Sequence, residues 1–293
     1  FWHPDSVEMN GRIFVFTANG FVHAIAPNSA TEWIFDTETG GTSTPISLAM
    51  DGTVYISSQS RLIALRPGDG SVKWQYDVSQ SGDAPAIGDN GVIYKGSGEF
   101  LYALDPDGFL LWTFSTNGSI GSPAIGSDGT IYICSDKVYA INLDGSEKWA
   151  VLDGGSSPAI ASDGTIYIGS GELYALDPDD GSIIWIFEGE GEGGYYTPTI
   201  GGDGTIYAGG KGTNLFSIDP NGTENWSFEA NEKLNSPVIG LDGTLYSTSW
   251  GSNLYAIGDT ISYSETNVNF SFDLSCYHGI FEELSGGYTP YIK

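Results

Sequence analysis

Apolar and polar residues alternate over short stretches of this chain, and the same order of stretches recurs along its length. Residues 158–185 hold one complete copy: Pro-Ala-Ile, an Asp-Gly turn, Thr-Ile-Tyr-Ile, Leu-Tyr-Ala-Leu, an Asp-Pro turn and a final segment with a tryptophan. Alternation with a period of two, bounded by Gly, Pro and Asp, is typical of β-strands joined by tight turns. Each copy therefore predicts four consecutive strands.

The copies follow one another at a nearly constant spacing. The prolines that open them are Pro4, Pro45, Pro85, Pro123, Pro158, Pro198 and Pro237. A step of roughly forty residues matches one four-stranded blade of a β-propeller. Both faces of such a sheet carry apolar residues, so neighbouring copies must cover them, and a closed ring leaves no uncovered end.

These patterns predict an all-β fold, a β-propeller of seven four-stranded blades, with eight blades as the alternative. Residues 1–260 hold the repeats, and residues 261–293 form a tail that we expect to supply outer or closing strands of the same propeller. Residues 268–274 alternate with a period of two and are interpreted as the fourth strand of the seventh blade. Residues 286–292 repeat the pattern of 193–200, which keeps the eight-bladed alternative open.

The last strand of most copies carries a tryptophan, and a small residue recurs in the strand before it. Small residues let adjacent sheets approach closely, so that the indole ring can cover the gap between them. We therefore expect the tryptophans to dock each blade on the next. They are Trp33, Trp74, Trp112, Trp149, Trp185 and Trp226.

The spacing of Ala175, Asp177, Gly181 and Trp185 resembles the tryptophan-docking repeat of the pyrroloquinoline-quinone-like propellers. Variants of this motif return in the other copies, and the resemblance covers roughly residues 4–258. It implies a propeller fold. The family's enzymes are quinone-dependent dehydrogenases that use Ca²⁺, a basic residue, a catalytic Asp and often adjacent cysteines. The family also contains the lipoprotein scaffold of the bacterial outer-membrane assembly machine and many surface proteins, and this chain looks more like those.

Composition narrows the choice of partners. The 293-residue chain has 37 acidic and 10 basic residues and a net charge of −27. This charge disfavours nucleic acid and anionic membrane surfaces, which attract Lys and Arg. No apolar run approaches the roughly 18 residues of a membrane span, so we expect no membrane insertion. The acids are interpreted as a solvated surface, with metal binding, a high-salt habitat or a cationic partner as alternatives. Because the chain starts at Phe1, we expect a mature form or a piece of a longer protein.

Aspartate-rich turns are the candidate metal sites. They place oxygen ligands two residues apart, as Ca²⁺ loops do, but lack the full loop and its distal Glu. Every blade also needs a hairpin turn at this place, so turn formation is the competing explanation. Apart from this possible Ca²⁺, we expect no cofactor. The candidate ligands are Asp105, Asp107, Asp177, Asp179 and Asp219.

Residues that break the repeat are better functional candidates than those that follow it. Tyr195, Tyr196 and Trp250 are irregular aromatics that could stack on a sugar or hold a peptide, or fill gaps between blades. Lys95 and Lys211 are irregular bases after the second strand of their copies. No arrangement of nucleophile and base suggests catalysis.

The sequence thus predicts a non-catalytic extracellular or cell-surface propeller that acts as a scaffold or as a binding module for protein or glycan. One alternative is a quinone-dependent dehydrogenase or its relic. The other alternative is a periplasmic scaffold for outer-membrane assembly.

Overall fold

A computed structural model describes residues 6–9, 11–17, 19–38, 46–58, 60–80, 83–240, 242–250 and 253–258. Contacts group Phe1–Gly258 into one compact unit, and the second unit, Asp259–Lys293, lies outside the described residues. The described part contains strands and turns and no helix, so no helix there is long and apolar enough to cross a membrane.

The first four sheets each contain four antiparallel strands in chain order. Their strands are β1 (Ser6–Met9), β2 (Arg12–Phe16), β3 (Phe21–Ile25) and β4 (Thr31–Asp36); β5 (Ile46–Leu48), β6 (Val54–Ser58), β7 (Arg61–Leu65) and β8 (Val72–Asp77); β9 (Ala86–Ile87), β10 (Ile93–Ser97), β11 (Phe100–Leu104) and β12 (Leu110–Ser115); and β13 (Ala124–Ile125), β14 (Ile131–Cys134), β15 (Val138–Ile141) and β16 (Glu147–Val151).

The remaining three sheets continue the pattern, and the last has three described strands. Their strands are β17 (Ala159–Ile160), β18 (Ile166–Gly169), β19 (Leu173–Leu176) and β20 (Ile183–Phe187); β21 (Thr199–Ile200), β22 (Ile206–Gly209), β23 (Asn214–Ile218) and β24 (Glu224–Glu229); and β25 (Val238–Ile239), β26 (Leu245–Thr248) and β27 (Leu254–Ile257).

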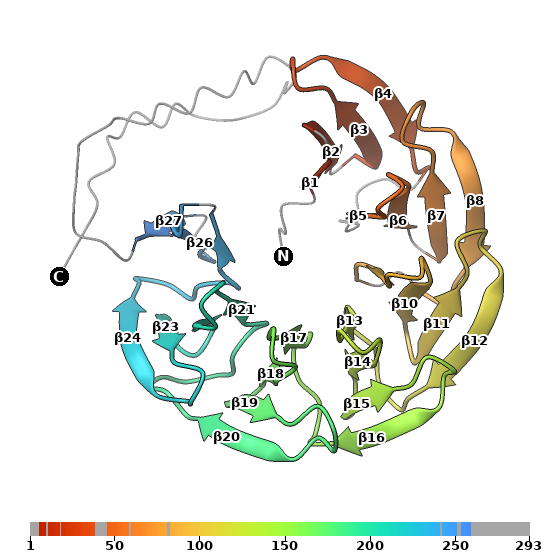
Figure 1. Ribbon diagram of the computed structural model, residues 1–293. Coiled ribbons are helices and arrows are strands. Elements are labelled where there is room, and N and C mark those ends of the chain that lie inside the picture. The colour runs from red at the N-terminus through yellow and green to blue at the C-terminus, as the bar shows by residue number, and fades with distance from the viewer. Residues whose placement is uncertain are drawn as a thin grey trace. The chain divides into compact units, whose positions relative to one another are not determined.

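The seven sheets confirm the predicted all-β propeller. In each sheet the first strand lies innermost, and the fourth strands form the periphery (Figure 1). First strands of successive sheets contact one another, as β5 does β9 and β13 does β17. The predicted fourth strand of the seventh blade, residues 268–274, lies outside the described residues, as does the rest of the predicted tail at 261–293.

Tryptophans join each of the first five sheets to the next. The indole N–H of each donates to a backbone carbonyl oxygen in the turn between the third and fourth strands of the following sheet, at 2.8–3.1 Å. The pairs are Trp33 with Pro67, Trp74 with Pro106, Trp112 with Leu143, Trp149 with Pro178, and Trp185 with Pro220. The matching turn for Trp226 would follow Gly258, outside the described residues.

Small residues make room for these rings, as the sequence indicated. Ala140 lies opposite Trp149 in the strand register and is fully buried. In the next sheet, Gly181 has a φ of 73°, and a Cβ there would lie 2.8 Å from the Trp149 ring. Glycine is needed at this position both for its left-handed backbone and for the close approach of the indole.

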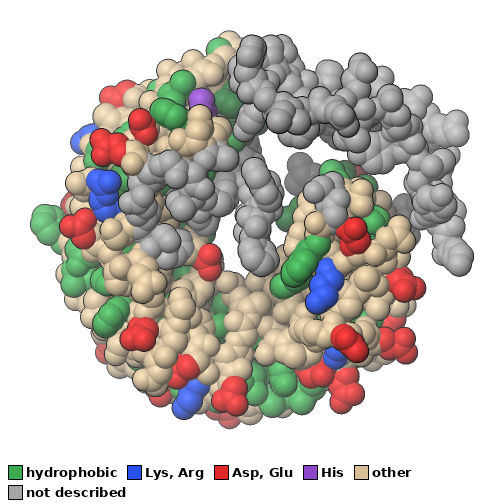
Figure 2. Space-filling model, turned by 180° about the vertical axis from the view of Figure 1, so that it is seen from behind, with side chains coloured by type: hydrophobic (Ala, Val, Ile, Leu, Met, Phe, Trp, Pro, Cys, Tyr) green, Lys and Arg blue, Asp and Glu red, His purple; other side chains and the backbone are tan. Residues whose placement is uncertain are grey.

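Consecutive antiparallel strands place the turns at two ends of each sheet. The first-to-second and third-to-fourth turns share one end, which we call the turn face. The second-to-third turns and the connections between sheets share the other end, which we call the loop face. On the face shown in Figure 2, acidic side chains are spread over the described sheets and basic side chains are fewer.

Candidate binding site on the loop face

The candidate metal ligands lie in the third-to-fourth turns of the turn face. An Asp105 carboxylate oxygen accepts the N–H groups of Asp107 and Phe109 at 3.0 and 2.9 Å. Asp177 accepts that of Asp179 at 2.8 Å, and Asp219 accepts that of Asn221 at 3.0 Å. These aspartates therefore stabilise the turns. Within the described ranges, no three or more His, Cys, Asp or Glu side chains gather where they could hold a metal ion.

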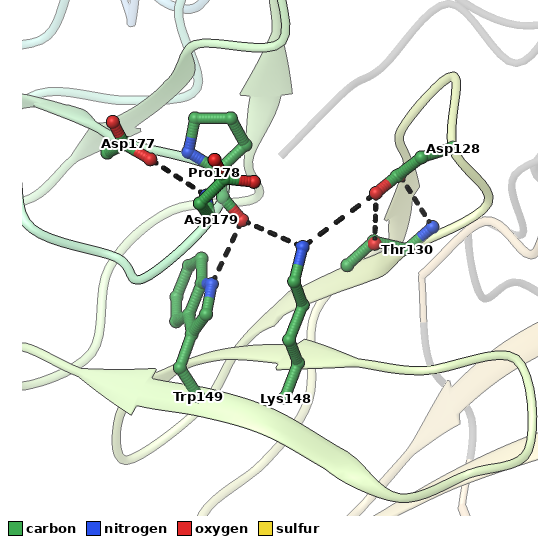
Figure 3. A network of polar contacts seen from close by, with 7 residues as sticks. All are labelled: Asp128, Thr130, Lys148, Trp149, Asp177, Pro178 and Asp179. Carbon is green, nitrogen blue, oxygen red and sulfur yellow. Dashed lines mark hydrogen bonds and ion pairs between the residues drawn. The ribbon is translucent and has the colours of Figure 1, made fainter.

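A basic side chain organises the turn face of the fourth sheet. The Lys148 ammonium lies 3.8 Å from Asp128 and donates to the carbonyl oxygen of Pro178, which also accepts the Trp149 indole (Figure 3). Partial burial raises the pKa of Asp128, but hydrogen bonds from Thr130 and the charge of Lys148 outweigh this and lower it. The polar groups of this part of the turn face are thus paired with one another.

The loop face is more irregular, because the connection between β20 and β21 carries extra residues. Its Tyr195 N–H donates to Ser170 O at 2.6 Å in the fifth sheet, and its Tyr196 N–H donates to Gly209 O at 2.9 Å in the sixth. Gly212 N–H donates to Glu192 O of the same connection at 2.8 Å. These bonds fasten the connection across two neighbouring sheets.

The structure places Tyr195 in the core, with 3% of its surface exposed. Its ring packs against Phe187 and Phe216, and its hydroxyl donates to Glu188 O at 3.2 Å. Burial, and secondarily the Glu172 carboxylate, raise the pKa of this phenol. Tyr195 therefore fills the gap between two sheets and supports the loop from beneath.

Lys211 fixes the same connection from the turn between β22 and β23. Its ammonium lies 2.6 Å from a Glu172 carboxylate oxygen, donates to the Glu188 carbonyl and sits 5.6 Å from the centre of the Tyr195 ring. The side chain is largely buried. Because its ammonium is paired with groups of this chain, Lys211 stabilises the connection between β20 and β21 and is not a contact residue for a partner protein.

Trp250 presents the accessible aromatic surface of this region, with 60% of the residue exposed. Its backbone N–H donates to Lys233 O at 3.0 Å, and the Lys233 ammonium lies 5.7 Å from the centre of its ring. Lys233 lies in the connection between β24 and β25. A Cβ at Gly193 would be 3.2 Å from the Lys233 ammonium, so the connection that carries Tyr196 reaches this lysine.

We call Lys233 and Trp250, together with Tyr196 from the connection whose Gly193 approaches Lys233, the loop cluster. Tyr196 is half-buried, and its ring packs over Gly210, where a Cβ would lie 2.7 Å away. The cluster joins aromatic surface and a cation in a chain with few bases, an arrangement suited to protein recognition. Sequence reasoning singled out both aromatics and missed Lys233. One signal in the sequence could have pointed to Lys233. It is a basic residue in a connection between two copies, where the repeat pattern does not call for one.

Other buried groups stay outside this cluster. Cys134 is buried in β14, and burial raises the pKa of its thiol to about 12. Lys95, expected after the second strand of its copy, lies within that strand, β10, and is fully buried.

Comparisons with known proteins agree with the propeller fold. A family model described as outer membrane protein assembly factor BamB matches residues 18–151 and 169–261. The chain belongs to this family. A search of the curated proteins finds no match. The family match confirms the expected resemblance to the pyrroloquinoline-quinone-like propellers.

Solved propellers resemble this member of the BamB family in fold. BamB from Moraxella catarrhalis superposes with a TM-score of 0.68 at 16% identity, covering 84% of this chain and 81% of that one. The computationally designed Ika8 protein gives a TM-score of 0.69 at 12% identity, covering 86% of each chain. The WD40 β-propeller domain of Doa1 gives 0.67 at 13% identity, covering 88% of this chain and 93% of that domain.

Proposed function

We propose that this chain is a non-catalytic scaffold that binds a partner protein through the loop cluster. The observation that carries the proposal is Trp250, a large aromatic side chain that is 60% exposed and lies beside the Lys233 ammonium. Exposed aromatics with an adjacent cation are typical centres of protein interfaces. Membership of the BamB family supports a protein partner over a glycan.

The family also bears on the compartment. Because its model is described as an outer membrane protein assembly factor, it supports the periplasmic assembly scaffold over an extracellular or cell-surface scaffold. An anionic protein of this charge is suited to a partner with a basic contact surface.

Paired variants test the binding site. We expect Trp250→Ala combined with Lys233→Ala to reduce the recovery of a specific co-purifying protein at least tenfold, because the variant removes both the aromatic surface and the cation. The measurement is quantitative mass spectrometry of proteins bound to the tagged chain in its source cells. The control is Met50→Ala, a residue that is 93% exposed on the turn face. Equal recovery from both variants would contradict the proposal.

The dehydrogenase alternative needs its own assay. Addition of pyrroloquinoline quinone and Ca²⁺ to the purified chain should leave the quinone absorption spectrum unchanged and give no dye-linked oxidation of alcohols. Quinone that stays bound through gel filtration, together with turnover, would establish the enzyme in place of the scaffold.

A further inference from the structure

The outer edge of β20 differs from the other described fourth strands. Its exposed residues are all apolar: Ile183, Ile184 and Ile186 are 44%, 52% and 48% exposed. Trp185 and Phe187 turn toward the sixth sheet, where their rings pack. In the sheet order β20 is terminal, so no described strand pairs with its outer edge.

The other described fourth strands carry charged or polar side chains among their exposed residues. Within two residues of the tryptophan, the exposed residues of β4, β16 and β24 include Glu32, Glu147 and Glu224, and those of β8 include Gln75. Charges on edge strands prevent unwanted pairing with other chains. β12 also lacks a charge, but it carries Thr113 and Ser115 among its exposed residues. β20 is thus the described fourth strand with the least protection against pairing.

Carboxylates lie at both ends of this apolar strand. Exposed Asp179 and Asp180 precede it in the turn, and exposed Glu188 and Glu190 follow it. An incoming strand would therefore meet apolar side chains in the middle and negative charge at each end.

We propose that β20 is a docking edge for an extended segment of a partner protein, which adds a fifth strand to this sheet. The segment would have apolar residues at alternating positions and Lys or Arg at both ends. Main-chain hydrogen bonds would supply affinity, and the isoleucines and terminal carboxylates would supply specificity. This surface is separate from the loop cluster and does not depend on it.

A second copy of this chain is a poorer occupant. Antiparallel pairing of two β20 edges would bring the aspartates at one end of each strand toward the glutamates of the other. Like charges opposed in this way are destabilising. A net charge of −27 on each copy adds to the repulsion.

Peptide binding tests the proposal. The probe is a fluorescent peptide that alternates valine with threonine between two lysines at each end, and the readout is fluorescence anisotropy. We expect saturable binding to the wild-type chain, and at least tenfold weaker binding to the Ile184→Lys, Ile186→Lys double variant. The same peptide with glutamates in place of lysines should also bind at least tenfold more weakly.

The matched control places the same charges on the neighbouring blade. Asn225→Lys with Ser227→Lys occupies the same positions relative to Trp226 in β24, and should change peptide affinity less than twofold. Amide hydrogen exchange should show protection at Ile183–Phe187 when the peptide is bound. Absence of saturable binding, or equal weakening by the control pair, would overturn the proposal. Dimerisation of the wild type that is abolished by the β20 variant would show that a second copy is the occupant.

Discussion

Replacing Lys95 with isoleucine is expected to raise the free energy of unfolding by about 2 kcal/mol at pH 7. Lys95 is fully buried, at a position where the sister strands β6, β14 and β18 carry Ile56, Ile133 and Ile168. Its ammonium donates to Asp83 O at 2.5 Å. Burial lowers the pKa of Lys95 to about 8, and the nearby Asp83 carboxylate opposes this only in part.

The size and sign of the effect follow from that pKa. A shift of one unit corresponds to about 1.4 kcal/mol, so burial of the charged lysine costs roughly 3 kcal/mol, less about 1 kcal/mol for the lost hydrogen bond. Between pH 8 and about 10 the unfolded chain keeps this proton while the folded chain releases it. Wild-type stability should therefore rise with pH across this window, and the rise should be absent in Lys95→Ile.

Urea denaturation at several pH values measures both effects. The control is Lys137→Ile, because Lys137 is exposed in the turn between β14 and β15 and its replacement should change stability by less than about 0.5 kcal/mol. A Lys95→Ile protein that is less stable than the wild type, or one that keeps the same pH slope, would contradict this account of the buried ammonium.

Replacing Trp149 with alanine should lower the free energy of unfolding by about 3–5 kcal/mol. The residue is 8% exposed, its ring lies 5.8 Å from that of Tyr132, and its indole docks on the next sheet at Pro178 O. The variant leaves a cavity between the fourth and fifth sheets. For a domain of this size the melting temperature should fall by roughly 10 °C.

Trp250→Ala is the matched control for this result, because it removes the same side chain from an exposed site. We expect its melting temperature to stay within about 2 °C of the wild type. Equal losses from the two variants would mean that contact between sheets is not what Trp149 provides. Thermal unfolding followed by circular dichroism measures both.

The sequence allowed much of the fold to be predicted, since each element has a local signal. Asp-Gly pairs mark the hairpins, and the recurring tryptophans are spaced so that each reaches the next copy. The placement of Tyr195 could not be read in this way. Its burial depends on Phe216, which is distant in sequence, and on a connection that folds back across two sheets.

The sequence also did not predict that β20 has an exposed apolar edge. Its run of Ile183, Ile184, Trp185, Ile186 and Phe187 indicates a strand, but apolar periodicity does not tell which faces a neighbour covers. In an outermost strand, one side has no neighbour. Residues 158–185 look like the most regular copy, yet the strand that ends this copy carries the least protected of the described outer edges.

The central claim is that the loop face, and not the turn face, contacts the partner protein. Site-specific photo-crosslinking tests it most directly, with a benzophenone amino acid at Asn253, which is exposed in the turn that carries Trp250, and, in a separate protein, at Met50. The account predicts that position 253 gives one discrete crosslinked protein in source cells, while Met50, on the turn face, gives none. The same crosslinked protein from both positions, or a discrete product from Met50 alone, would contradict it.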